Sequence, residues 1–450
     1  MFDKKNIKIY DSLSNSVRPF KPIKENEISM YVCGPTVYNH NHIGNARPVI
    51  FFDMVKKYFE YVGYNVKMVM NFTDIDDKII KKAIEENITE TEVSEKYIEA
   101  FLKLCDSLNC DQDVVRPRVT KTMDEIVDFI DKLQEREYAY QSGDDVFFRV
   151  KKVIDYGALS NQQLEELESG SRINVNDQKE DPRDFTLWKK TSDTGKKWDS
   201  QFGAGRPGWH TECVVMIHKI LGNLIDIHGG GNDLKFPHHE NEIAQAMALC
   251  NNKIANYWLH NARVDLGGQK MSKSLGNIVL AKDVVSEYGA EATRLMILSN
   301  HYRQNINYSQ ELMTSSVTEW NKIKNTKNSL QRKLELSGID KEGTLLPIMD
   351  DFLTELGNDF NTSNAFTLVY KLLKEINSSL RNPNVDINLL CDQYKTLSDM
   401  LSILGINTCL PNLTDKEKEL VVSWQNARKE KNFELADKLR KEITEAGIIL

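Results

Sequence analysis

The sequence predicts an α/β fold in which a doubly wound parallel sheet is interrupted by an insertion and followed by an all-α helical bundle. Three observations support this fold class. A strand, a helix and a second strand follow one another within residues 30–70. Apolar patterning of the same kind returns from about residue 208. From about residue 281 onward, apolar residues recur at helical spacing with almost no strand signal.

The first strand–helix–strand unit is clearly marked. Residues 30–33 are a short apolar run before a Gly-Pro turn, as expected for a buried parallel strand. Helical spacing follows up to Gly63, with Pro48 near the predicted helix start, and residues 66–70 alternate as a second strand. A right-handed crossover makes this unit half of a Rossmann-type sheet. The segment NFTDIDDKI follows the second strand, where such sheets form ligand crevices.

The remaining chain divides by pattern. Residues 138–197 look like an inserted module, with a turn and strand at Gly143–Phe148 and a long polar loop after it. Residues 224–228 indicate a strand of the second half-sheet, and residues 240–249 indicate a helix. We expect five segments: 1–115, 116–207, 208–265, 266–315 and 316–450.

Composition excludes several protein classes. The 450 residues predict two to four domains, and 40% apolar with 28% charged residues is typical of a soluble globular protein. No apolar run reaches the roughly 20 residues of a membrane span, and the first residues do not form a secretory signal. Seven scattered cysteines favour a reducing cytoplasm over a disulfide framework. The net charge of −8 argues against a general nucleic-acid coat protein but allows a local basic face.

Four residues have the chemistry of a metal site. Cys33 ends the first strand and Cys213 lies at the start of a later helix. His238 and Glu242 are four residues apart and so share one face of a helix. Two thiolates, an imidazole and a carboxylate suit zinc. Two core cysteines beside a solvated helix would look the same in sequence, because free cysteine is among the most buried residue types.

Two loops have the composition of phosphate-binding segments. His42-Ile43-Gly44-Asn45 enters a helix, so its N–H groups and the positive end of the helix dipole would face an anion. Lys270-Met271-Ser272-Lys273-Ser274 is a cationic loop between glycines, suited to neutralising a triphosphate. An ordinary N-capped helix and a solvated surface turn explain the same residues, so both interpretations stay open.

In this order and at this separation, the motifs resemble a known family. HIGN with KMSKS is similar to the paired signature of the class I aminoacyl-tRNA synthetases. Within that family, six segments together resemble the cysteinyl-tRNA synthetases: YVCGPTVY, NFTDIDDKI, DPRDFTLWK, GRPGWHTEC, GGGNDLKFPHHENEIAQ and WLHNARVDLGGQKMSKSLGN. The resemblance runs from about residue 8 to the end and is densest up to about residue 305.

The resemblance implies an organisation for the five segments. Residues 1–115 and 208–265 would be the two halves of the Rossmann catalytic domain, and 116–207 the connective insertion between them. Residues 266–315 would carry the KMSKS loop and the region that contacts the tRNA stem. Residues 316–450 would be the helical anticodon-binding domain.

The resemblance also implies a substrate site. One zinc ion would be held by Cys33, Cys213, His238 and Glu242 and would take the substrate thiolate as a further ligand, which separates cysteine from serine without editing. Magnesium would accompany ATP. The implied substrate residues are Gly34, Thr73 and Trp209 for cysteine, and Thr36, Asn39, His42, Asn45, Gly230, Asp233 and Lys273 for ATP, with His42, Asn45, Lys270 and Lys273 as the catalytic residues. For Trp209 a core position is the alternative.

The implied reaction is that of a cysteine–tRNA ligase. L-Cysteine and ATP would form cysteinyl-adenylate and pyrophosphate, and the cysteinyl group would pass to the 3′ end of tRNA(Cys). We expect a cytoplasmic monomer without membrane attachment. Contacts to tRNA are expected from Arg294, His301, Tyr302, Arg303, Arg428, Lys429 and Lys431, with solvated helix ends as the alternative. Many members continue further in an aromatic and basic tail, so anticodon reading here is expected to use fewer or other contacts.

Two other functions fit part of the same pattern. A ligase of the same lineage would activate cysteine and attach it to a small amino sugar, and it would share the zinc and phosphate motifs. The long helical C-terminal part argues against it. A catalytically silent tRNA-binding paralogue would usually lose catalytic motifs, whereas HIGN and KMSKS are both intact here.

Overall fold

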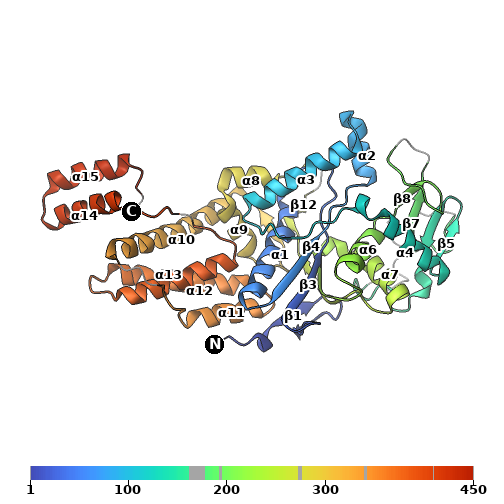
Figure 1. Cartoon of the computed structure of the whole chain (residues 1–450), viewed down its shortest axis with the longest axis horizontal. Coiled ribbons are helices and arrows are strands. Elements are labelled where there is room, and N and C mark those ends of the chain that lie inside the picture. The colour runs from blue at the N-terminus through green and yellow to red at the C-terminus, as the bar shows by residue number, and fades with distance from the viewer. Residues whose placement is uncertain are drawn as a thin grey trace.

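The computed structural model of the chain (Figure 1) describes residues 2–161, 178–191, 195–271, 276–338, 342–408 and 410–448. At its centre is a parallel sheet with strand order β10–β9–β3–β4. Its strands are β3 (Glu27–Val32), β4 (Asn65–Met70), β9 (Ile225–Gly231) and β10 (Ala255–Asn261). The chain runs outward from β3 to β4 and later returns to the other side of β3. The predicted doubly wound sheet is therefore confirmed, and its order reverses between β3 and β9, where such sheets open a ligand crevice.

Alternating residues of the strands give the sheet two buried faces. Met30 and Val32 pack in one core cluster with α1 (Ile43–Tyr61), the helix that connects β3 to β4. Tyr31 points to the other face, in a second cluster with the helices α4 (Met123–Glu135), α6 (Thr211–Ile220) and α7 (Glu240–Cys250). Both faces are covered, as expected for parallel strands with almost continuously apolar sequences.

Helix α1 begins earlier than its proline suggests. The helix starts at Ile43, so Pro48 lies in its second turn rather than at its start. Pro48 has no N–H to donate to the carbonyl of Gly44, four residues earlier. The proline is near the helix start as predicted, but it lies about one turn beyond the first position, where its missing N–H would cost little. The predicted end is correct, because α1 stops at Tyr61 and Gly63 has a φ of +88°.

The segment between the two half-sheets contains helices and an antiparallel sheet. After β4 come α2 (Asp77–Glu86), α3 (Glu90–Ser107) and α4. An antiparallel sheet follows in the order β5–β6–β7–β8 (Ala139–Ser142, Asp145–Phe148, Phe185–Lys190 and Gly205–Pro207). The turn predicted at Gly143 joins β5 to β6. A short N-terminal hairpin, β1 (Lys8–Asp11) with β2 (Ser16–Pro19), precedes the whole arrangement.

Beyond β10 the described chain is mainly helical, as predicted. A small sheet of β12 (Gln269–Lys270), β11 (Val264–Leu266) and β13 (Ile306–Tyr308) comes first, and β13 was not expected. Helices α8 (Ala281–Tyr288) and α9 (Ala290–Leu298) lie between β12 and β13. The bundle that follows consists of α10 (Gln310–Ser337), α11 (Ile348–Gly357), α12 (Thr362–Arg381) and α13 (Ile387–Ile403). In Figure 1 the hairpin of α14 (Asp415–Lys429) and α15 (Phe433–Glu445) lies beyond this bundle, at the end opposite the insertion.

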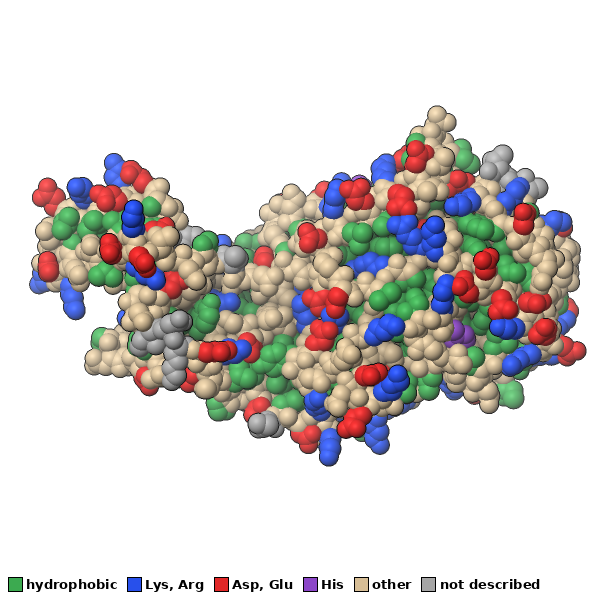
Figure 2. Space-filling view, viewed as in Figure 1, with side chains coloured by type: hydrophobic (Ala, Val, Ile, Leu, Met, Phe, Trp, Pro, Cys, Tyr) green, Lys and Arg blue, Asp and Glu red, His purple; other side chains and the backbone are tan. Residues whose placement is uncertain are grey.

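The surface carries charged side chains of both signs (Figure 2). Figure 2 shows basic and acidic side chains interspersed over the face in view. Among the described residues, no helix combines the length and the apolar character that crossing a bilayer requires.

Candidate active site

Four predicted metal ligands converge although they are far apart in the chain. The Sγ atoms of Cys33 and Cys213 lie 3.9 Å apart. Cys213 Sγ lies 3.6 Å from His238 Nε2, and Cys33 Sγ lies 3.7 Å from Glu242 Oε1. All four ligand atoms lie within 4.8 Å of one another. His238 and Glu242 are at most 2% exposed, so solvated-helix positions are excluded for them.

Each ligand is positioned by a strand end or a helix start. Cys33 directly follows β3, and its N–H donates to the carbonyl of Gly229 in β9, which places it at the reversal of strand order. Cys213 is in the first turn of α6. His238 lies in the helical turn Lys235–His239 that leads into α7, and Glu242 is in the first turn of α7.

The distances fit a tetrahedral zinc ion. Zinc bonds of about 2.3 Å to sulfur and about 2.0 Å to nitrogen, at tetrahedral angles, separate two sulfurs by about 3.8 Å and sulfur from nitrogen by about 3.5 Å. The observed separations of 3.9 and 3.6 Å agree. His238 Nε2 and Glu242 Oε1 are 2.9 Å apart, a direct hydrogen bond that a metal ion between them would replace. The donor set and its spacing therefore suit zinc.

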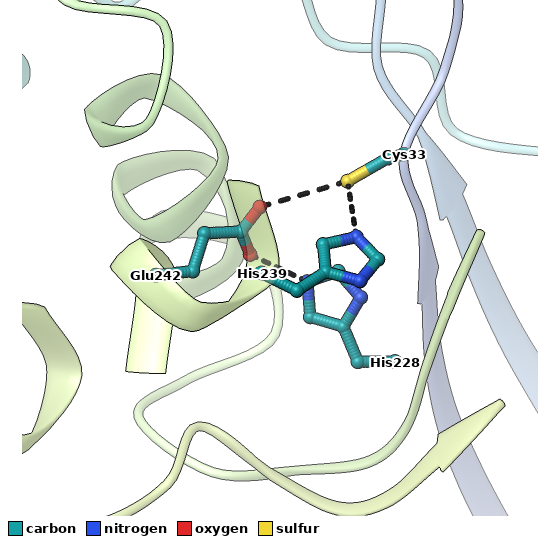
Figure 3. Close-up of side chains that lie close together, drawn as sticks. All are labelled: Cys33, His228, His239 and Glu242. Atoms are coloured by element: carbon teal, nitrogen blue, oxygen red, sulfur yellow. Dashed lines mark hydrogen bonds and ion pairs between the residues drawn. The ribbon is translucent and has the colours of Figure 1, made fainter. Parts of the chain in front are cut away.

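Two further histidines contact the same ligands (Figure 3). His228 Nε2 lies 2.6 Å from Glu242 Oε2, and His239 Nε2 lies 3.3 Å from Cys33 Sγ. Cys33, His228, His239 and Glu242 also form a group with metal-binding spacing. His239 Nδ1 is in turn 2.8 Å from His260 Nε2. Metal-binding side chains are usually oriented by such outer hydrogen bonds, so these histidines suit the role of supports for the four ligands.

The charges of the cluster are coupled. Burial raises the pKa of Cys33, whereas a hydrogen bond from the Cys33 thiol lowers the pKa of Cys213 to about 6. Burial opposes ionisation of Glu242, but the adjacent His228 and His238 hold its pKa well below the usual range. The cluster thus keeps a thiolate and a carboxylate together in a buried place, the donors that a divalent cation needs.

A cavity of about 680 Å³ extends from this cluster along the carboxyl edge of the sheet. The loops after β3 and β4 form one wall, because Thr36 and Thr73 pair as a β-bridge and Gly34 N–H donates to Asn71 Oδ1 over 2.9 Å. The cavity brings together most of the residues predicted for zinc, cysteine and ATP, namely Cys33, Gly34, Thr36, Asn39, His42, Asn45, Thr73, Trp209, Cys213, Asp233 and His238.

Three residues predicted for ATP binding or catalysis are not among the described residues that line the cavity. Gly230 is buried behind the wall, and its neighbour Gly231 lines the cavity instead. Lys270 is described only by its backbone, which pairs with Asp265 between β12 and β11. Lys273 lies outside the described residues. Met271, between these lysines, is buried and lines the cavity.

Trp209 is at the cavity rather than in the core. Its side chain is 42% exposed and stacks on the ring of His238, with ring centroids 4.4 Å apart. It therefore covers His238, a predicted metal ligand, and also lines the pocket, which agrees with the predicted apolar wall.

Comparisons with known proteins agree with this geometry. The profile of the family described as "tRNA synthetases class I (C) catalytic domain" matches residues 19–318, and that of the "DALR domain" matches residues 351–408. The chain is 44% identical to the cysteine–tRNA ligase of Shouchella clausii, covering 99% of this chain and 97% of the relative. It is 43% identical to that of Bacillus licheniformis, covering 98% and 96%.

The chain belongs to the cysteine–tRNA ligase family.

Solved structures of other synthetases share the fold. A methionyl-tRNA synthetase of Mycobacterium tuberculosis, in complex with methionyl-adenylate, superposes with a TM-score of 0.61 at 14% identity. The match covers 84% of this chain and 89% of that one. A putative arginyl-tRNA synthetase of Campylobacter jejuni superposes with a TM-score of 0.55 at 14% identity, covering 86% and 95%. The class I synthetase fold is thus confirmed for this cysteine–tRNA ligase family member.

Two of the expected tRNA contacts are wrong. Arg294 is 0% exposed and Tyr302 is 3% exposed, so neither side chain reaches a bound RNA, and neither is a solvated helix end. Arg294 instead pairs with Asp53 of α1 over 2.7 Å, and the Tyr302 hydroxyl donates to Asp359 over 2.7 Å. Arg303 is also held by Asp359, over 2.7 Å. The sequence shows no local sign of this burial, because the acidic partners lie far along the chain.

The remaining tRNA predictions concern His301 and the end of α14. The Nε2 atom of His301 lies 3.6 Å from Asp359 Oδ2, so this side chain is also turned toward the bundle. Arg428, Lys429 and Lys431 are exposed at the end of α14, and their role in RNA binding stays a prediction.

Sequence reasoning missed several polar residues of the cysteine–tRNA ligase site. His228, His239 and His260 are buried beside the metal ligands, and Asn71 holds the Gly34 backbone. For His228, His260 and Asn71 the available signal is that they end apolar strand patterns, where the carboxyl edge of a parallel sheet collects functional side chains. His239 lies in the helical turn before α7 and had no such signal. Arg47, which is also fully buried, had no such signal.

Proposed function

We propose that this chain is a cysteine–tRNA ligase that activates L-cysteine with ATP and magnesium, then transfers the cysteinyl group to the 3′ end of tRNA(Cys). The observation that supports this most strongly is the convergence of Cys33, Cys213, His238 and Glu242 at one end of a cavity that the HIGN segment also lines. One part of the cavity is suited to a thiol, and the other to phosphate. A substrate that spans both is cysteine joined to a nucleotide.

A zinc ion on these four ligands would bind a thiolate strongly and a neutral hydroxyl weakly, and so would select cysteine over serine. The protein's own residues orient the rest of the substrate. Thr73 is buried next to Gly34, and with Trp209 these two residues form the walls around a side chain as small as that of cysteine.

Adenylate formation then depends on position and charge. The cysteine carboxylate attacks the α-phosphorus in line, a new O–P bond forms, and the bond to pyrophosphate breaks. His42 and Asn45 at the start of α1 lie on the cavity, where N–H groups and side chains meet developing phosphate charge. Thr36, Asn39 and Asp233 line the same cavity and are proposed to hold ATP. Lys270 and Lys273 are proposed to neutralise the phosphates.

The helical part supports tRNA over a small acceptor. The DALR domain match and the bundle α10–α13 are features that a ligase for an amino sugar would not need. We propose the division into catalytic halves 1–115 and 208–265, insertion 116–207, KMSKS region 266–315 and anticodon-binding region 316–450. We also propose that the protein acts as a cytoplasmic monomer.

The test combines metal content with two activity assays on one sample. Wild-type protein should contain about one zinc per chain, catalyse cysteine-dependent ATP–pyrophosphate exchange, and charge tRNA with cysteine. Cys213→Ser should lose zinc and raise the KM for cysteine, because one thiolate ligand is gone. Cys250→Ser is the matched control, since Cys250 is half-buried at the far end of α7 and is not part of the ligand group.

Each assay distinguishes the proposed function from one alternative function. Exchange without transfer to tRNA would favour the amino-sugar ligase. Absence of cysteine-dependent exchange would favour the catalytically silent paralogue. Unchanged zinc and an unchanged cysteine KM in Cys213→Ser would contradict the ligand assignment.

A further inference from the structure

Arg47 lies in α1, two residues after Asn45, and its guanidinium joins two distant segments of the chain. Nη1 donates to the carbonyl oxygens of Ala262 and Arg263 over 2.8 and 2.9 Å. Nη2 donates to those of His301 and Gln304 over 3.1 and 2.6 Å. The side chain is 1% exposed. One buried cation therefore donates to four backbone carbonyls that belong to two separate segments.

The first of these segments is a wall of the cavity. Residues 261–264 run from the last residue of β10 to the first residue of β11, at the carboxyl edge of the sheet, and all four line the cavity together with His42 and Asn45. The second segment supports the first, because Ala262 N–H donates to the carbonyl of Tyr302 and Ile306 N–H donates to that of Arg263. Arg47 thus connects the helix start expected to face phosphate with the opposite wall of the same cavity.

The chain after the lysine segment is also attached to the start of α1. Ile43 N–H donates to the carbonyl of Val279, and Ala281 N–H donates to that of Asn41, both over 2.9 Å. The segments on both sides of residues 272–275 are therefore tied to the first two turns of one helix. The attachments of Ile43 and Ala281 are backbone hydrogen bonds, whereas Arg47 makes its attachment through its side chain, so a substitution can change it.

A second buried arginine, Arg294, has contacts that indicate a purely structural role. Arg294 is 0% exposed and donates to the carbonyls of Leu404 and Leu108. None of its acceptors lines the cavity. Arg294 pairs with the carboxylate of Asp53, whereas Arg47 donates to four backbone carbonyls.

Burying a charge without a bonded carboxylate is costly. Burial lowers the pKa of Arg47 to about 10, partly offset by Asp265, so the group stays charged at neutral pH. An apolar side chain of similar volume would avoid this cost, and what the planar fork adds is a defined geometry between the two segments.

We propose that Arg47 is a positioning residue for the nucleotide: it sets the distance between the wall at residues 261–264 and the helix start at His42 and Asn45. This inference rests on the proposed function, because it takes the bound nucleotide to be ATP. Arg47 itself is behind the wall and does not touch the substrate.

The test compares Arg47→Lys with Arg294→Lys in the full-length chain. A lysine ammonium is one point and cannot hold four carbonyls of two segments. We expect Arg47→Lys to raise the KM for ATP in pyrophosphate exchange about tenfold, which corresponds to losing about one charge-assisted hydrogen bond, and to change the KM for cysteine less than twofold. Arg294→Lys should lower thermal stability but change both KM values less than twofold.

Hydrogen exchange gives a readout that does not depend on activity. In Arg47→Lys, amides of Ala262 and Ile306 should exchange at least about tenfold faster than in wild type, and in Arg294→Lys they should not. Where Arg47→Lys does not fold, Arg47→Gln, whose amide still donates to one carbonyl, replaces it. The inference is overturned when Arg47→Lys raises both KM values equally, or when exchange at these amides is unchanged.

These outcomes are separate from those of the proposed function. A wild-type protein without cysteine-dependent pyrophosphate exchange would count against the proposed function. The hydrogen-exchange comparison would still decide whether Arg47 holds the wall.

Discussion

Replacing Arg294 by methionine should weaken the attachment of the C-terminal helices to the catalytic core. The arginine lies in α9 and is fully buried. It donates to Asp53 over 2.7 Å, to the carbonyl of Leu404 over 2.9 Å and to that of Leu108 over 3.0 Å. Methionine fills most of the volume but satisfies none of these acceptors.

The size of the destabilisation in Arg294→Met depends on which hydrogen bonds and ion pairs each acceptor of Arg294 retains. Breaking a buried ion pair by removing one partner costs about 3–5 kcal/mol. Asp53 retains Lys57 at 2.6 Å and the Asp111 N–H at 2.8 Å, so its charge is not left alone. We therefore expect a loss of stability at the low end of this range, about 3 kcal/mol. Most of it comes from the two carbonyls that lose their donor and from the lost ion pair with Asp53.

Native-state hydrogen exchange measures the loss of stability locally, near the replaced residue. A local measurement is suitable because chains with several domains generally do not unfold in a two-state manner. About 3 kcal/mol predicts exchange roughly 100-fold faster at amides near Leu404 and Leu108. Arg118→Met is the matched control, because Arg118 pairs with Glu95 at the surface and such pairs contribute about 0–1 kcal/mol. An Arg294→Met protein whose local exchange changes less than about fivefold would refute the reasoning.

Three further predictions concern the site. Gly34→Ala should lower activity and thermal stability, since its Cβ would lie 1.7 Å from the carbonyl oxygen of Asn71; an unchanged melting temperature and cysteine KM would contradict this. Lys273→Ala should slow adenylate formation far more than it weakens cysteine binding, and single-turnover rates close to wild type would remove its assigned role. Chelation of the metal should abolish cysteine-dependent exchange and lower the melting temperature, and added zinc should restore both; a metal-free protein with full exchange activity would exclude the zinc proposal.

Local features were predictable from sequence because neighbouring residues encode them. The strand just before Cys33, the helix that begins within HIGN, and the i,i+4 spacing of His238 and Glu242 all depend on residues that are close together in the chain. These features also carry the family resemblance. These local features indicate which side chains are available for binding, but they do not indicate which side chains lie close together in the folded protein.

The meeting of distant residues was decided only by tertiary structure. Cys33 and Cys213 are 180 positions apart and come within 3.9 Å because β9 returns beside β3. The same packing buries Arg294 against Asp53 and Arg47 against two loops, so residues whose charge suggested the surface lie in the interior. Sequence by itself determined the elements and the chemistry they offer. Strand order and burial, which depend on long-range packing, decided which groups form the site and which only support it.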